Sequence, residues 1–259
     1  LDKEKLQEKT KIILTVKDME GHVIRKIDGP ASKGFNRISW DLRTASKAPI
    51  KVDDKKSENQ PSGYMVKPGR YTVTLSKEFD GVVTTLSEPM EFEVVQMREG
   101  VLEGAEPQEV VDFWNRLEIL QGELGAASIV LNNAKNRVAA ISDALSRTEM
   151  EPGDINKKVY DIKIELANIE REFYGSKSKS EVGERNNPTV YSRLGVAQTG
   201  TRSSTYGPTP THRKSLEIAK KEFNHLKKLL NTIVENKIPA IEKELSEAKA
   251  PWIEGQKLP

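Results

Sequence analysis

The hydrophobic residues of this chain change period near residue 100, and this change constrains the fold more than any other feature. Before Arg98, apolar residues alternate with polar ones, as in Ile12, Leu14 and Val16, which is the pattern of half-buried strands. After Gly104 they recur at alternating steps of three and four, the pattern of helices that pack along a seam. The sequence therefore predicts a β part followed by a helical part.

Short runs of alternating residues, separated by turn residues, predict an immunoglobulin- or fibronectin-like β-sandwich over residues 11–98. We expect the segment Trp40–Arg43 to end one strand, and Lys67–Tyr71 to open another. In the second segment Pro68 and Gly69 suit a type II turn, because proline presets φ and glycine accepts a positive φ. The predicted inward-facing residues are Leu14, Ile38, Trp40, Tyr71, Val73, Phe92 and Val94.

The residues 105–250 carry three apolar stripes and predict an antiparallel three-helix coiled-coil bundle. The first helix follows Pro107, Pro152-Gly153 breaks the chain before the second, and Thr209-Pro210 starts the third. The third stripe shifts by one residue beside Pro239, where we expect a kink. The three stripes are Val110, Phe113, Leu117, Leu120, Leu124, Ala127, Leu131, Ala134, Val138, Ile141 and Leu145, then Ile155, Val159, Ile162, Leu166, Ile169 and Phe173, and finally Leu216, Ala219, Phe223, Leu226, Leu230 and Ile233.

Three further segments complete the predicted organisation. Residues 1–10 are expected to be a linker from an upstream domain, because the chain opens without Met and without a hydrophobic signal region. Residues 175–207 are rich in Ser, Thr, Asn and Gly and are expected to form a long loop, in which a short helix around Val190 pins the segment to the bundle. Residues 251–259 form a tail.

The composition excludes several classes of function. Lys and Arg number 41 and Asp and Glu 39, for a net charge of +2, so no overall field attracts nucleic acid. Cysteine is absent, which removes disulfides and thiolate metal sites. No apolar run approaches the roughly 20 residues that a membrane-spanning helix needs.

No catalytic, cofactor or metal site is predicted. The three histidines, His22, His212 and His225, do not have the spacing of a recognised metal motif. Ser203 and Ser204 lack the Gly-x-Ser-x-Gly turn that exposes a nucleophile. The fragment is therefore predicted not to be an enzyme, and it needs no cofactor.

Three aromatic residues are the candidates for contact with a ligand or a partner. Trp252 follows Ala250-Pro251 in the tail, outside the predicted core, while Tyr191 and Tyr206 lie in the long loop. Tryptophan and tyrosine offer a flat apolar face together with a polar group, which suits sugars and protein surfaces alike.

A family resemblance rests on motifs in both parts. The segments Asp18–Gly21, Val23–Arg25, Gly34–Arg43 and Val66–Val73 resemble the Ig-like module of the flagellar hook-capping protein and of C-terminal domains in exported bacterial proteins. The segments Pro208–Arg213 and Ala250–Ile253 are similar to the C-terminal region of bacterial proteins with sortilin-like, BNR-repeat β-propellers, which are often labelled glycosyl hydrolases.

The resemblance implies an accessory C-terminal module of an exported protein, located in the periplasm, the outer membrane or outside the cell. Its partners would be the upstream β-propeller of the same polypeptide and an envelope protein or a glycan. We expect a non-catalytic structural and interaction module, and the alternative is a carbohydrate-binding accessory region of a glycoside-processing protein. No catalytic residue follows from the resemblance.

Overall fold

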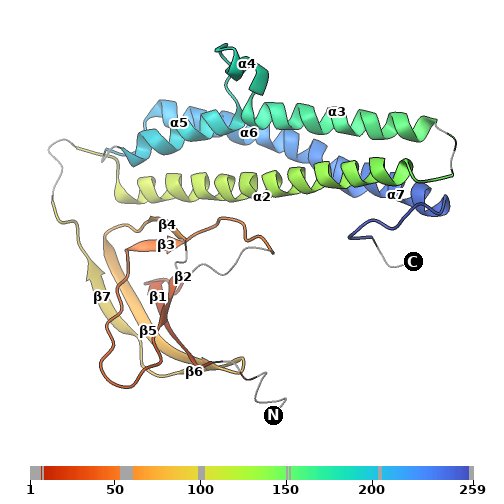
Figure 1. Cartoon of the computed structure of the whole chain (residues 1–259). Helices are drawn as coiled ribbons and strands as arrows, with labels where there is room; N and C mark the ends of the chain where they lie inside the picture. Colours follow the sequence, from red (N-terminus) through yellow and green to blue (C-terminus); the bar gives the residue numbers. More distant parts are fainter. Residues whose placement is uncertain are drawn as a thin grey trace. The chain divides into compact units, whose positions relative to one another are not determined.

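The chain folds into a β part followed by a helical part, so the mixed β and α class is confirmed (Figure 1). The computed structural model describes residues 7, 9–52, 61–98, 103–149, 151, 153–203 and 206–256. They form two compact units, Leu1–Glu118 with Thr205–Gly207, and Ile119–Ser204 with Pro208–Pro259. No helix among the described residues combines the length and the apolar character that crossing a membrane requires.

The first unit is built on an antiparallel sheet. Its strands are β1 (Lys11–Asp18), β2 (Val23–Gly29), β5 (Gly69–Phe79), β6 (Val82–Thr85) and β7 (Met90–Val94), in the order β2-β1-β5-β6, with β7 also paired to β5. Leu14 lies opposite both Ile27 and Leu75. Residues directly opposite each other share a face, so this register confirms that the predicted alternation separates an apolar face from a polar one.

Aromatic side chains cover part of the apolar face. The ring of Trp40 makes edge contacts with Tyr71 and Phe92, at centroid distances of 5.8 and 6.0 Å. Tyr71 is buried as predicted, and its hydroxyl donates to the Lys67 carbonyl at 2.7 Å. The other predicted core residues are only half-buried, because the cover over this face is partial: Leu14, Ile38, Trp40, Val73, Phe92 and Val94.

The predicted strand ending at Trp40–Arg43 is wrong. Residues 35–42 form no strand, and β3 spans only Arg43–Ala45, paired with β4 (Ser62–Met65) in a separate two-stranded sheet. Local hydrogen bonds replace the expected strand pairing, since the Trp40 indole donates to the Arg43 carbonyl at 2.9 Å and the Arg43 amide donates to Asp41 at 3.1 Å. Side chains that bond to nearby backbone compete with strand formation in this way.

The helical part contains α2 (Pro107–Leu145), α3 (Asp154–Tyr174), α4 (Lys177–Glu181), α5 (Val190–Arg202), α6 (Pro210–Thr232) and α7 (Ile238–Glu247). The stripe predicted for α3 is buried throughout, as is that of α6. On α2 the buried stripe runs from Phe113 to Ala144, while Val110 and Leu145 at its ends are half-buried. Ion pairs between helices add to this packing, as Lys135 with Glu170 at 2.7 Å and Lys158 with Glu244 at 2.7 Å.

The segment 175–207 contains two helices, α4 and α5, rather than mostly loop. The helix α5 realises the expected pinning element. Its N-terminus is capped by Thr189, whose side chain accepts from the Ser192 amide, and its buried residues are Val190, Leu194, Ala197 and Thr201. Val196 is as apolar as Val190, but it is exposed because it lies on a different face of the helix from these buried residues.

A π-helical turn, Ile233–Lys237, joins α6 to α7. It lies where a kink was expected, next to Pro239. The Ile238 amide donates to the Ile233 carbonyl, five residues back, and both side chains are buried. Pro239, in the first turn of α7, has no amide hydrogen to donate. The π turn adds one residue between two helical registers, which explains the shift of the apolar stripe.

Candidate ligand cleft

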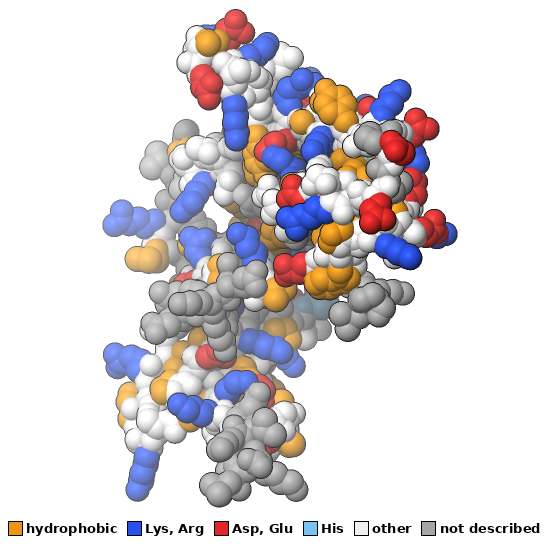
Figure 2. Space-filling view, turned by 45° about the vertical axis from the view of Figure 1, so that its right-hand side comes forward, with side chains coloured by type: hydrophobic (Ala, Val, Ile, Leu, Met, Phe, Trp, Pro, Cys, Tyr) orange, Lys and Arg blue, Asp and Glu red, His pale blue; other side chains and the backbone are white. Residues whose placement is uncertain are grey.

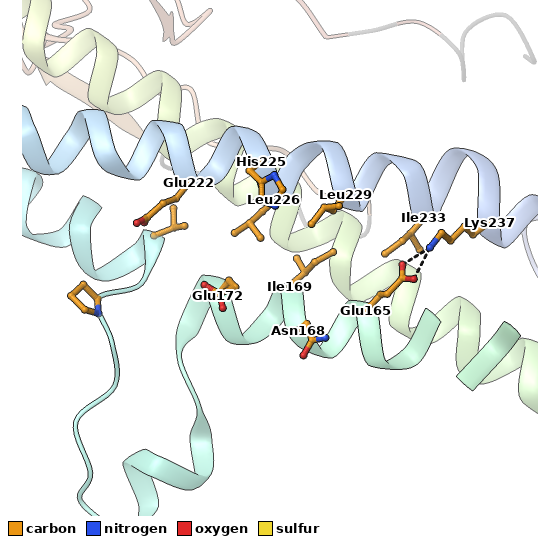
Figure 3. Close-up of a pocket in the computed structure, with 12 residues that line it drawn as sticks. Glu165, Asn168, Ile169, Glu172, Glu222, His225, Leu226, Leu229, Ile233 and Lys237 are labelled. Carbon is orange, nitrogen blue, oxygen red and sulfur yellow. Dashed lines mark hydrogen bonds and ion pairs between the residues drawn. The ribbon is translucent and has the colours of Figure 1, made fainter. Parts of the chain in front are cut away.

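A cleft of about 520 Å³ lies within the second unit, between α3, the start of α5, and the segment formed by α6 and the π turn (Figure 3). From α3 it is lined by Glu165, Asn168, Ile169 and Glu172, from the segment before α5 by Pro188, and from the first residue of α5 by Val190. The opposite wall consists of Glu222, His225, Leu226, Leu229, Ile233 and Lys237.

Helical periodicity places these residues on two facing stripes. On α3 the lining residues are spaced i, i+3, i+4 and i+7, and on α6 Glu222, His225, Leu226 and Leu229 repeat the same spacing. Residues three and four apart lie on one face of a helix. The π turn then continues the wall, since its first and last residues, Ile233 and Lys237, both line the cleft. π-helical turns occur frequently at functional sites.

The floor of the cleft is apolar and its edge is partly open. Val190, Ile169, Leu226 and Ile233 are buried where the helices meet. Leu229, one turn beyond Leu226 on α6, is 44% exposed. Leu229 is thus the apolar side chain that the cleft offers to a ligand, and without a ligand it is partly exposed to water.

Two ion pairs hold the walls. The Lys237 ammonium lies 2.6 and 2.7 Å from the two carboxylate oxygens of Glu165 (Figure 3). At the other end, Nε of Arg193 on α5 donates to Glu222, at 3.0 Å from its nearer oxygen. All four groups are partly exposed, so each pair contributes about 1 kcal/mol or less to stability. Their main effect is to fix the positions of the carboxylates.

Glu172 and His225 complete the polar edge. Within the described part of the chain, neither side chain has an ion pair or a hydrogen bond, and both are exposed. The cleft residues therefore include three carboxylates and one ammonium group, that of Lys237. Arg193 on α5, which does not line the cleft, pairs with a second carboxylate, that of Glu222. Glu172 is the carboxylate that remains available to a ligand.

The three predicted contact residues do not line the cleft. Trp252 and Tyr206 are exposed, at 49% and 45%, and Tyr206 belongs to the first unit. Tyr191 lies on α5 and stacks on Tyr174, with ring centroids 4.9 Å apart and planes at 19°. The Tyr191 hydroxyl is 2.7 Å from Ser128 Oγ on α2, so its polar group is already used inside the unit.

Burial raises the pKa of the Tyr191 phenol; its hydrogen bond to Ser128 opposes this shift, and Tyr174 adds to it. Ser128 Oγ also accepts from the Tyr174 hydroxyl at 2.7 Å and donates to the Leu124 carbonyl at 2.8 Å. One serine thus joins residues of α2, α3 and α5. Tyr191 thus has a structural position, on the short helix that was expected to pin this segment to the bundle.

One cluster outside the cleft brings three metal-ligating side chains together. Asp18, Glu20 and His22 lie at the turn between β1 and β2, with one ligand atom of each within 4.8 Å of the others. Asp18 accepts from the amides of Glu20 and His22 at 3.0 and 2.8 Å. Burial acts to raise the Asp18 pKa, but its hydrogen bonds and the charge of His22 outweigh this and lower it. These contacts build a turn, which explains the cluster without a metal ion.

The cleft residues were not identified from the sequence, although one signal pointed to their position. The stripe shift beside Pro239 marks the π turn that carries Ile233 and Lys237. No local pattern indicates that α3 lies against this turn. Comparison with protein-family models, with curated proteins and with solved structures found no match.

Proposed function

We propose that this chain is a non-catalytic structural and interaction module, and that the cleft between α3, α5 and α6 is its contact surface. The observation that carries the proposal is Leu229, which remains 44% exposed beside a buried apolar floor. Concave apolar surface edged by a few polar groups is the usual character of a binding site. Ion pairs fix the walls, so the surface is formed before a partner arrives.

The proposal extends to the fold of each part. We assign the β part to an Ig- or fibronectin-like sandwich, and α2, α3 and α6 to an antiparallel three-helix coiled-coil bundle. The apolar sheet face beneath Trp40 supports the first assignment, and the buried three-four stripes support the second.

The biological setting rests on the sequence resemblance. We propose that the module belongs to a larger exported bacterial β-propeller protein, where it contacts that propeller or an envelope component. Figure 2 shows basic and acidic side chains interspersed, with apolar side chains between them, on the face in view. A mixed surface of this kind suits protein contacts better than nucleic acid.

The alternative is a carbohydrate-binding region. Trp252 favours it, because its side chain is 49% exposed and an accessible tryptophan ring can stack on a sugar ring. The stacked pair Tyr174–Tyr191 supports it less, because both hydroxyls bond to Ser128.

A selection with the full chain tests both functions. The immobilised chain is presented with a displayed library of random peptides and, in parallel, with a glycan array. Leu229→Asp should abolish peptide retention. The matched control is Ile164→Asp, since Ile164 on α3 is also 44% exposed but lies outside the cleft; this variant should retain the peptides. Glycan retention that is lost in Trp252→Ala would favour the alternative, and the absence of any cleft-dependent peptide would contradict the interaction proposal.

A further inference from the structure

We propose that the cleft receives a basic amphipathic helix of a protein partner, whose apolar side chains cover the exposed Leu229 above the buried floor and whose Lys or Arg side chain reaches Glu172. This inference rests on the proposed interaction function and specifies the partner's chemistry.

The shape of the cleft favours a helix. Its longer wall runs from Glu222 to Lys237 along a nearly continuous helical segment, and the fifteen steps between these residues, at about 1.5 Å each, give a wall about 22 Å long. A helix of about four turns has this length. Helices bind such grooves through apolar residues spaced i, i+3 or i+4, and i+7, the spacing that the lining residues themselves follow.

The volume sets how much of the partner enters. At about 520 Å³ the cleft is too small for a whole helix and suits a few side chains projecting from one face. Leu229 lies exposed between the buried floor and solvent, where a side chain of the partner helix would contact it first. The partner's remaining faces would stay in water, which requires an amphipathic sequence rather than a uniformly apolar one.

The charges select a basic partner. Lys237 holds Glu165 and Arg193 holds Glu222, which leaves Glu172 as the carboxylate without an ion pair within the described part of the chain. A Lys or Arg side chain can lay its methylene stem over the exposed Leu229 and place its cationic head near Glu172. An acidic helix would instead bring a carboxylate close to Glu172, and the repulsion between them would weaken binding.

The experiment compares peptides by charge. Helical peptides recovered by the selection are synthesised with a fluorophore, together with versions in which every Lys and Arg is replaced by Glu, and titrated with the full chain by fluorescence anisotropy. Basic peptides should bind, and charge reversal should weaken binding by about 100-fold. Glu172→Lys should weaken the basic peptides at least about tenfold, and more at low salt than at high salt.

The matched control is Glu217→Lys, which makes the same charge change on α6 at an exposed glutamate outside the cleft, and which should shift affinity less than about twofold. Cleft-dependent peptides that are acidic or neutral, or that tolerate Glu172→Lys, would overturn the basic-helix inference and leave the interaction function standing. Binding only of small cations such as spermidine would also overturn it. Circular dichroism of each variant confirms that the helices are intact.

Discussion

Gly200 on α5 lies directly against the imidazole ring of His212 on α6. A Cβ built on Gly200 would be 2.6 Å from Cε1 and 2.9 Å from Cδ2 of that ring. The same histidine caps its own helix, since the Thr209 amide donates to its Nδ1 at 3.2 Å. A side chain at position 200 would therefore require this ring to move from the place where it accepts from the Thr209 amide.

Gly200→Ala should destabilise the helical unit by about 1–3 kcal/mol, because the added methyl forces the ring from its capping position. Gly195→Ala is the matched control on the same helix, with no atom within 4 Å of the added Cβ. It should stabilise by about 0.5–1 kcal/mol through helix propensity. Urea unfolding measures both, and equal effects of the two substitutions would contradict the Gly200–His212 contact.

Trp40→Ala should destabilise the first unit by about 3 kcal/mol, the lower end of the range for a large aromatic residue, because Trp40 is half-buried. Trp40→Phe keeps an aromatic ring beside Tyr71 and loses the hydrogen bond to the Arg43 carbonyl, which should cost about 1 kcal/mol. A loss below about 1 kcal/mol for Trp40→Ala on denaturant titration would reject a core role for this residue and reopen the sugar-stacking interpretation.

Glu118→Gln should stabilise the first unit at neutral pH. Burial raises the pKa of Glu118 despite the nearby Lys47 and Arg43, and its Oε2 atom has no hydrogen-bond partner among the described residues. A carboxyl group whose pKa is higher in the folded state contributes stability below its unfolded pKa, and this contribution is lost as the pH rises through the folded value. The gain from Glu118→Gln should therefore appear above the ordinary glutamate pKa of 4.5.

The measurement for Glu118 is the free energy of unfolding of both proteins from about pH 4 to about pH 7.5. The two curves should converge at the acid end and separate toward neutral pH, with the Gln variant more stable. A variant that is less stable by the same amount at every pH would show that the carboxylate of Glu118 is favourable where it lies.

Ser128→Ala should destabilise the second unit by about 1–2 kcal/mol, because it removes the oxygen to which Tyr174 and Tyr191 both bond. Hydrogen exchange should quicken along α5 in particular. Ser142→Ala on the same helix removes a hydroxyl whose one partner among the described residues is the Val138 carbonyl within α2, so it should be nearly neutral. Similar exchange in both variants would show that Ser128 does not hold α5.

The full chain should hydrolyse no glycoside. Two of the three cleft carboxylates, Glu165 and Glu222, accept hydrogen bonds from cationic groups, whereas glycoside hydrolysis requires a carboxylic acid that donates a proton opposite a second carboxylate. A panel of chromogenic glycosides checks this. Turnover that disappears with one specific Asp or Glu substitution would reveal an active site.

The division into a β part and a helical part, and the residues that the long helices bury, were predictable because periodicity is a local property. Ile155 to Phe173 are buried at every predicted step of α3, since a helix with one apolar stripe gains stability only by covering it. The strand register likewise follows the alternation around Leu14 and Leu75. The failure at Trp40 has a local cause as well, because its indole satisfies the Arg43 carbonyl in place of a strand partner.

The cleft depends on contacts that no local pattern contains. Lys237 meets Glu165 across 72 residues of sequence, and Arg193 meets Glu222 across 29. Heptad stripes require that each helix bury one face but do not state which helix covers which, since many pairings bury similar apolar area. By itself the sequence determined the β and helical parts and the buried faces of the long helices, whereas only the tertiary structure decided that α3, α5 and the π turn meet and leave Leu229 partly open.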